Sequence, residues 1–182
     1  LLDRFFDGDF SAISDIDQYV NQNDSTLIDS ILIDFQDKYF AFIKALIESI
    51  QVTELDENSM DYISTSLHLL ALLTDQKKSE FNDLLTEKFI QKLIFLVQQE
   101  YVGININSLW CISNLIWISE FSFDIFSRNK IFSLLSNLIV SEKEKIITLS
   151  ALISKRALTA KIHFELYEIN PIISILHELI NY

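Results

Sequence analysis

Glycine and proline are almost absent from this chain, which holds two glycines and one proline in 182 residues. The hairpins and tight turns of β-sandwiches and barrels use these residues repeatedly, because they supply backbone angles that other residues avoid. Apolar residues form 49% of the chain and charged residues 22%, a composition typical of a globular protein. The sequence therefore predicts an all-α fold.

Apolar residues recur every three or four positions along most of the chain, which is the period of helices with one buried face. The spacing of Phe10, Ile13 and Ile16 predicts a short first helix, begun by Asp9 or Ser11. Further helices are expected at 26–35, 37–50, 59–73, 80–86, 87–99, 108–119, 121–127, 130–140, 142–160, 162–168 and from 171 onward.

Three helix boundaries are expected from single residues. Ser59 is placed to cap the helix that runs to Leu73, because a serine hydroxyl accepts a bond from a free N–H of the first turn. Tyr101–Asn105 contains Gly103 and is expected to form a turn. Asn170 is expected to cap the last helix, with Pro171 in its first turn, where the missing N–H does no harm.

A short, a medium and a long helix follow one another more than once, which indicates an internal repeat. Ile131–Ile139 aligns with Ile172–Ile180 at an offset of 41 residues, and Phe89–Val97 aligns with the former at an offset of 42. These registers place Phe81 under Phe123. A period near 40 residues built of two or three helices is typical of armadillo and HEAT repeats. We expect a right-handed superhelical solenoid whose long helices line a concave face.

Residues 1–182 are interpreted as a single armadillo-like domain of about three full repeats and part of a fourth, cut from a longer solenoid. Its open, apolar end would let a further segment or another chain dock. Asn129 and Asn170 hold the position between the first two helices where armadillo units often place glycine. Asparagine tolerates positive φ better than most residues do.

One helix carries two tryptophans and an asparagine on a single stripe. In SLWCISNLIWIS, Trp110, Asn114 and Trp117 stand at i, i+4 and i+7, so they share one face. In one interpretation both indoles pack inward and the amide of Asn114 bonds to a neighbouring segment. In the other, the stripe is a binding surface, where indole faces attract cations and an amide holds an extended backbone.

SLWCISNL resembles the long-helix motif of armadillo proteins in the importin-α group, which reads roughly A-x-W-x-L-S-N. The resemblance implies that Trp110 and Asn114 face a groove that holds an extended basic peptide, the nuclear localisation signal. At the offset of 41 residues Trp110 corresponds to Ala151 and Asn114 to Lys155, so the pair does not recur there. Lys155 and Arg156 would repel a basic peptide at that end.

The net charge of −12 disfavours binding to a nucleic-acid backbone and favours basic proteins or peptides as partners. Glu120 and Asp124 follow the tryptophan helix and are candidates to receive basic side chains, or are solvated charges of a turn. His68 lies in an apolar helix and is interpreted as a core or groove residue.

Neither catalysis nor a cofactor is expected. The three histidines and the single cysteine do not form a metal-ligand pattern, and two glycines cannot build a phosphate-binding loop. Cys111 is expected to be a small buried hydrophobe. A lone cysteine excludes a disulfide framework and favours the cytosol or the nucleus, and no apolar run is long enough to span a membrane.

These features predict a non-enzymatic protein-binding adaptor, with a basic import signal or basic client protein as the favoured partner. The alternative is a scaffold subunit or co-chaperone, such as a nucleotide-exchange factor or a dedicated chaperone, that docks a folded partner.

Overall fold

The computed structural model describes residues 4, 9, 11–22, 36–57, 59–74, 79–116, 118, 120–139, 143–159 and 166–181. Every regular element in these ranges is a helix, so the predicted all-α fold is confirmed there. None of these helices has both the length and the apolar run that crossing a bilayer requires. The chain divides into two compact units, Leu1–Leu73 and Thr74–Tyr182. The interpretation of residues 1–182 as one repeat domain stays a prediction.

The first unit is helical throughout its described part. Its helices are α2 (Ala12–Gln22), α4 (Gln36–Val52) and α5 (Met60–Thr74, whose last residue belongs to the second unit). The sequence predicts an inner face of Phe40, Ile43, Leu46, Ile47 and Ile50 for α4; the last four are buried, and Phe40 is partly exposed. The helix expected at 26–35 lies outside the described residues.

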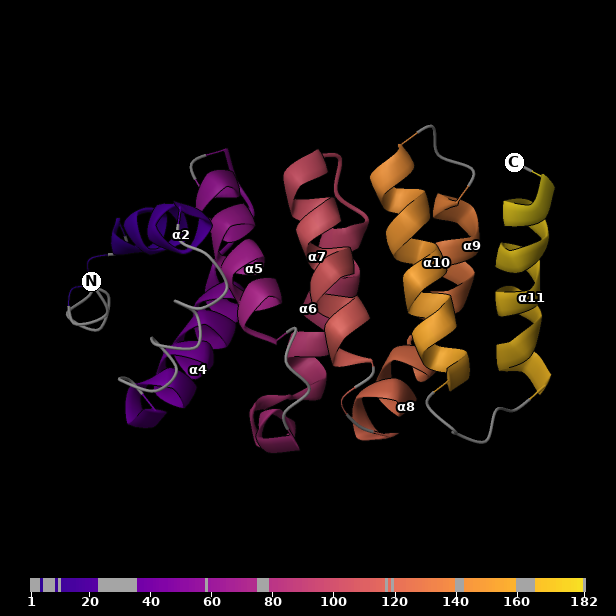
Figure 1. Cartoon of the computed structure of the whole chain (residues 1–182), viewed down its shortest axis with the longest axis horizontal. Helices are drawn as coiled ribbons and strands as arrows, with labels where there is room; N and C mark the ends of the chain where they lie inside the picture. Colours follow the sequence, from indigo (N-terminus) through magenta and orange to yellow (C-terminus); the bar gives the residue numbers. More distant parts are fainter. Residues whose placement is uncertain are drawn as a thin grey trace. The chain divides into compact units, whose positions relative to one another are not determined.

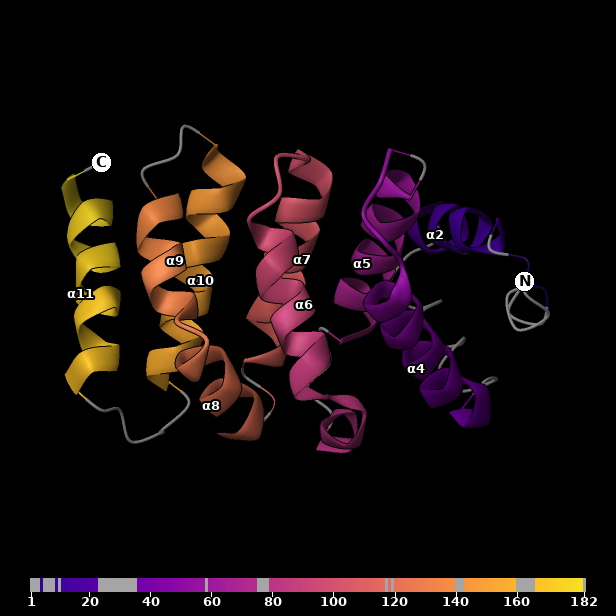
Figure 2. The ribbon, with the colours of Figure 1, turned by 180° about the vertical axis from the view of Figure 1, so that it is seen from behind.

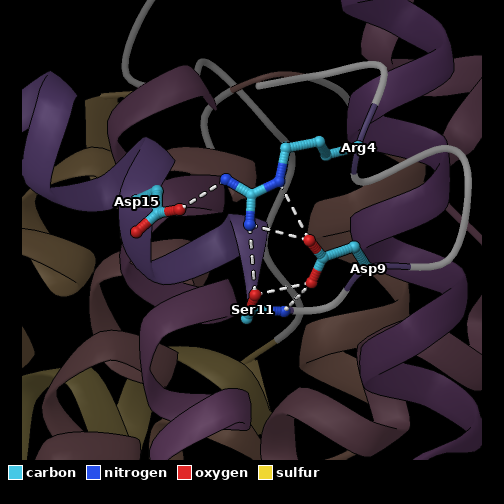
Figure 3. Close-up of polar contacts among 4 residues, drawn as sticks. All are labelled: Arg4, Asp9, Ser11 and Asp15. Atoms are coloured by element: carbon cyan, nitrogen blue, oxygen red, sulfur yellow. Dashed lines mark hydrogen bonds and ion pairs between the residues drawn. The ribbon is translucent and has the colours of Figure 1, made fainter.

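Asp9 and Ser11, where the sequence predicts that the first helix begins, belong to a polar cluster at the start of α2 (Figure 3). Asp9 Oδ1 accepts hydrogen bonds from the N–H of Ser11, at 3.1 Å, and from its hydroxyl, at 2.5 Å. The Arg4 guanidinium donates to Asp9 Oδ2 at 2.7 Å and to Asp15 Oδ2 at 2.8 Å. These contacts fix the direction in which the chain enters α2, and they use Asp15, an acidic residue of its first turn.

Ser59 stands immediately before α5, as predicted, but its hydroxyl serves the preceding loop. The Ser59 carbonyl accepts from the N–H of Ile63 at 2.8 Å, as expected at the start of a helix. Its hydroxyl instead donates to the carbonyl of Glu54 at 2.6 Å and accepts from the N–H of Asp56 at 2.9 Å. The side chain therefore closes the loop and leaves the first turn of α5 uncapped by Ser59.

The second unit contains two successive sets of a short, a medium and a long helix, followed by one more helix. The elements are η1 (Ser79–Leu84, a 3₁₀ helix), α6 (Glu87–Val97), α7 (Val102–Leu115), α8 (Glu120–Arg128), α9 (Ile131–Leu138), α10 (Glu144–Thr159) and α11 (Leu166–Asn181). Phe81 in the first short helix and Phe123 in the second are both buried, as the repeat register predicts.

Within this unit the long helices form one layer and the medium helices another. α7 and α10 lie side by side in Figure 1, and α6 and α9 come to the front in Figure 2. α7 packs on α6 and on α10, α10 packs on α9, and α11 contacts both α9 and α10. The α7–α10 layer therefore presents one continuous surface, which we call the α7–α10 face.

Two predicted boundaries are wrong. Tyr101–Asn105 is not a turn, because α7 begins at Val102 and Gly103 lies in its first turn. A glycine is least costly there, where the backbone N–H groups have no partner within the helix in any case. α11 begins at Leu166 and continues through Pro171, so Asn170 lies inside the helix and does not cap it. The proline removes one backbone hydrogen bond without ending the helix.

Candidate functional site

α7 exposes a single narrow stripe. Gly103, Ile106, Asn107 and Trp110 are partly exposed, whereas the other residues from 104 to 116 are buried. The spacing of these four residues places them on one side of the helix. α7 contains no charged residue. Its exposed side is therefore neutral, with the indole of Trp110 as the largest group on it.

The stripe ends where Arg156 of α10 covers the last turn of α7. Arg156 Nη1 donates to Asn114 Oδ1 at 2.7 Å, to the Ser113 carbonyl at 2.8 Å and to the Ser113 hydroxyl at 3.1 Å. Asn114 Nδ2 lies 3.5 Å from the hydroxyl of Thr74. Asn114 is only 3% exposed, so its amide is satisfied within the protein. A ligand that used this amide would have to displace Arg156.

Helix ends in this unit are closed by side-chain amides as well as by Arg156. At the end of α6, the carbonyls of Ile94, Phe95 and Val97 accept bonds from the side chains of Gln98, Gln99 and Asn105 at 3.1, 2.8 and 2.6 Å. The last carbonyls of a helix have no partner within the helix, and glycine-based turns often satisfy them. In this glycine-poor chain, amides take over that role.

Arg156 and Asn105 satisfy carbonyls at helix ends, but the apolar periodicity of the sequence does not identify them as residues with this role. The signal that points to them is the shortage of glycine, which implies that helix ends need side-chain partners. The partner of each remains hidden in the sequence, because Arg156 is 42 residues from Asn114 and Asn105 is eight residues from Val97.

On α10, the residues beside α7 are basic and apolar. Lys145, Leu152 and Arg156 are seven and four residues apart, so they share one stripe, and the bonds of Arg156 show that this stripe borders α7. Leu152 lies one turn before Arg156, just as Trp110 lies one turn before Asn114. Lys145 and Lys155 are exposed, and Leu152 is half-buried.

The other predicted site residues are not among the described side chains of α7 and α10. Trp117 lies outside the described residues, and Glu120 begins α8 but its side chain is not described. Asp124 is exposed and forms an i, i+4 ion pair with Arg128 at 3.5 Å. His68 belongs to the first unit, where its Nδ1 lies 2.6 Å from Asp17 Oδ1. A role in ligand binding for each of the six residues stays a prediction.

Cys111, the single cysteine of the chain, is poorly placed for covalent chemistry. Cys111 is fully buried in α7, and burial raises the pKa of its thiol, so the thiolate nucleophile is disfavoured. Within those ranges no three His, Cys, Asp or Glu side chains gather closely enough to hold a metal ion.

Most of the negative charge lies in the first unit. Residues 1–73 contain 14 acidic and 3 basic residues, a net charge of −11, whereas residues 74–182 contain 12 and 11, a net charge of −1. The total of −12 therefore does not describe the second unit, to which Trp110 belongs.

No family model matches the chain, and no curated protein is similar to it in sequence. Among solved structures it is similar to a designed armadillo repeat protein in complex with the peptide (KR)4, with a TM-score of 0.51 and 14% identity. The match covers 75% of this chain and 63% of the designed protein, which is less than two thirds of that protein's length. At this identity the likeness concerns the fold alone, and it confirms the predicted all-α solenoid fold of armadillo type.

Proposed function

We propose that this chain is a non-enzymatic protein-binding scaffold that holds an extended peptide on its α7–α10 face. The observation that carries the proposal is the partly exposed indole of Trp110, on an uncharged stripe of α7 beside a second long helix. An indole packs on methylene chains and attracts cations, so it suits a peptide side chain laid across it. The similarity in fold to a designed armadillo protein that holds a peptide supports the same use.

More specifically, we propose that the chain acts in nuclear import in the cytosol or the nucleus. Its partner would be a basic import signal or a basic client protein. The support for this proposal is the resemblance of SLWCISNL to the importin-α motif and the net charge of −12. Because that charge resides in residues 1–73, a basic client would be attracted mainly to the first unit. Glu120 and Asp124 are the acidic residues proposed to receive it next to α7.

The test compares peptide binding by the unaltered chain and by the Trp110→Ala variant. Binding is measured by fluorescence anisotropy with labelled octapeptides of basic, neutral and acidic composition. We expect the variant to lose at least about fivefold in affinity for whichever peptide the chain binds, since removing a central aromatic anchor costs about 1–3 kcal/mol. Circular dichroism should stay unchanged. Phe95→Ala is the matched control, because Phe95 is 49% exposed on α6, in the other layer of the unit. Equal binding by both variants would contradict the proposal.

The alternative function, docking of a folded partner, is favoured by one observation on α11. Ile173, Leu176 and Ile180 are 55%, 40% and 84% exposed and recur at i, i+3 and i+7, which forms an apolar stripe. Hydrogen exchange with a candidate partner separates the two functions. Protection of α11 without protection of α7 would favour a scaffold or co-chaperone over a peptide-binding adaptor.

A further inference from the structure

The charge of the α7–α10 face is opposite to that of the whole chain. α7 has no charged residue, and residues 143–159 contain four basic residues and one acidic residue. The basic residues are Lys143, Lys145, Lys155 and Arg156, and the acidic one is Glu144. The two helices that form the face therefore carry a net positive charge, although the chain carries −12.

Two lysines are available to a ligand on this face. Lys145 lies on the stripe of α10 that borders α7, and Lys155 precedes Arg156, whose guanidinium reaches across to Asn114. Both lysines are exposed, and neither forms an ion pair with any residue that the structure describes. Their ammonium groups are therefore solvated charges that a carboxylate can approach at little cost.

The apolar groups of the face lie between these two lysines. Leu152 is seven residues after Lys145 and three before Lys155, and Trp110 occupies the corresponding level of α7, one turn before Asn114. Both side chains are partly exposed. An extended segment crossing this region would lay an apolar side chain or a methylene chain over the indole and place its charged groups near the lysines.

Screening by salt favours the charges that lie nearest to such a segment. At physiological ionic strength the Debye length is about 8 Å, so charges farther from the peptide than this are largely screened. The excess of acidic residues belongs to residues 1–73, whereas the lysines belong to the face itself. The exposed lysines of the face therefore favour a segment that carries acidic side chains.

From this arrangement we infer that the α7–α10 face binds an extended peptide segment that carries Asp or Glu side chains, with the carboxylates against Lys145 and Lys155. This inference rests on the proposed peptide-binding function and defines its ligand class. A basic partner, which the total charge suggests, would then bind a different part of the chain.

The test compares two labelled octapeptides on the whole chain at 150 mM salt, namely (KR)4 and a peptide of the same length with alternating Asp and Glu. We expect the acidic peptide to bind more tightly and its affinity to fall as salt is raised. Lys145→Glu combined with Lys155→Glu should weaken it about fivefold or more, since each exposed ion pair contributes up to ~1 kcal/mol. Lys88→Glu with Lys92→Glu, on α6, changes the net charge equally and should leave affinity nearly unchanged.

The outcomes separate this inference from the function on which it rests. Acidic-peptide binding that depends on Trp110 and on the two lysines of α10 supports both. If (KR)4 binds through Trp110 and the lysine reversal strengthens it, the acidic ligand class is wrong and the peptide-binding scaffold stands. If neither peptide binds in a manner that depends on Trp110, the proposed function fails and this inference fails with it.

Discussion

Arg156 on α10 holds Asn114 on α7, with 2.7 Å between Nη1 of the arginine and Oδ1 of the asparagine. The same nitrogen donates to the Ser113 carbonyl, one of the last carbonyls of α7, at 2.8 Å. The C-terminal end of a helix carries a partial negative charge, so a guanidinium there is stabilising as a charge and as a hydrogen-bond donor. One side chain of the following long helix thus completes the end of the preceding one.

Replacing Arg156 with alanine should lower the free energy of unfolding by about 1–3 kcal/mol, because it leaves a buried amide oxygen and a helix-end carbonyl without their donor. Urea denaturation followed by circular dichroism measures this loss. Arg156→Lys should retain part of the stability, since an ammonium donates to these oxygens but lacks the planar fork. Lys155→Ala is the control and should change stability by less than about 0.5 kcal/mol. An equal effect of both alanine variants would contradict the cap.

Two buried serines of α7 should respond differently to alanine. The Ser113 hydroxyl accepts from Arg156 at 3.1 Å, whereas the buried Ser108 hydroxyl has no hydrogen-bond partner among the residues that the structure describes. Ser113→Ala should therefore cost about 1 kcal/mol of unfolding free energy, while Ser108→Ala should be neutral or stabilising. The two residues share helix, residue type and full burial, which makes each a control for the other in thermal denaturation. A larger loss at Ser108 would contradict the hydrogen-bond assignment.

Lys130→Gly should stabilise the second unit. Lys130 has a φ of 60° and a ψ of 34°, a left-handed conformation that costs a residue with a Cβ roughly 1–2 kcal/mol. Glycine removes this cost but adds backbone entropy to the unfolded state, so the expected net gain is about 0.5–1 kcal/mol. The measurement is the midpoint of urea unfolding. Lys130→Ala, which keeps the Cβ, should give no such gain, and a gain of the same size would show that the charge is responsible.

Ser11→Ala should raise the pKa of Asp9. Hydrogen bonds from Ser11, and secondarily from Arg4, hold the pKa of this carboxyl below its ordinary value of 3.8. A carboxyl with a lowered pKa stabilises the folded state when it is ionised. Its contribution is therefore present at neutral pH and is lost as the pH falls below 3.8 through the folded-state value. NMR titration of the carboxyl carbon measures the shift. Ser14→Ala, an exposed change in the first turn of α2, should leave the titration unchanged.

The sequence predicts the helix order well, because apolar spacing and repeat register both report burial. Phe81 and Phe123 stand in matching registers and are both buried in short helices. Helix ends are predicted less well, since they depend on which side chain supplies a distant donor. The sequence favours Asn129 for a left-handed conformation, but the structure has that conformation at Lys130, and the Asn129 side chain bonds to the carbonyl of Ile125 at 2.8 Å.

The sequence predicts only part of the candidate site, because the site too depends on a side chain from a distant part of the sequence. The spacing of Trp110 and Asn114 places them on one stripe of α7, but it does not reveal that α10 buries the asparagine and leaves the tryptophan partly exposed. That difference arises from Arg156, 42 residues away. Periodicity within one helix carries no information on what the next long helix projects onto it.

The closure of α7 by Arg156 also affects how the second unit assembles. Repeat proteins gain stability from the interfaces between neighbouring modules as well as from each module itself. Because the last turn of α7 obtains a donor from α10, docking of α10 stabilises that turn. The two modules should therefore melt as one cooperative transition, and fraying that starts at α10 should spread into the end of α7 before it reaches α6.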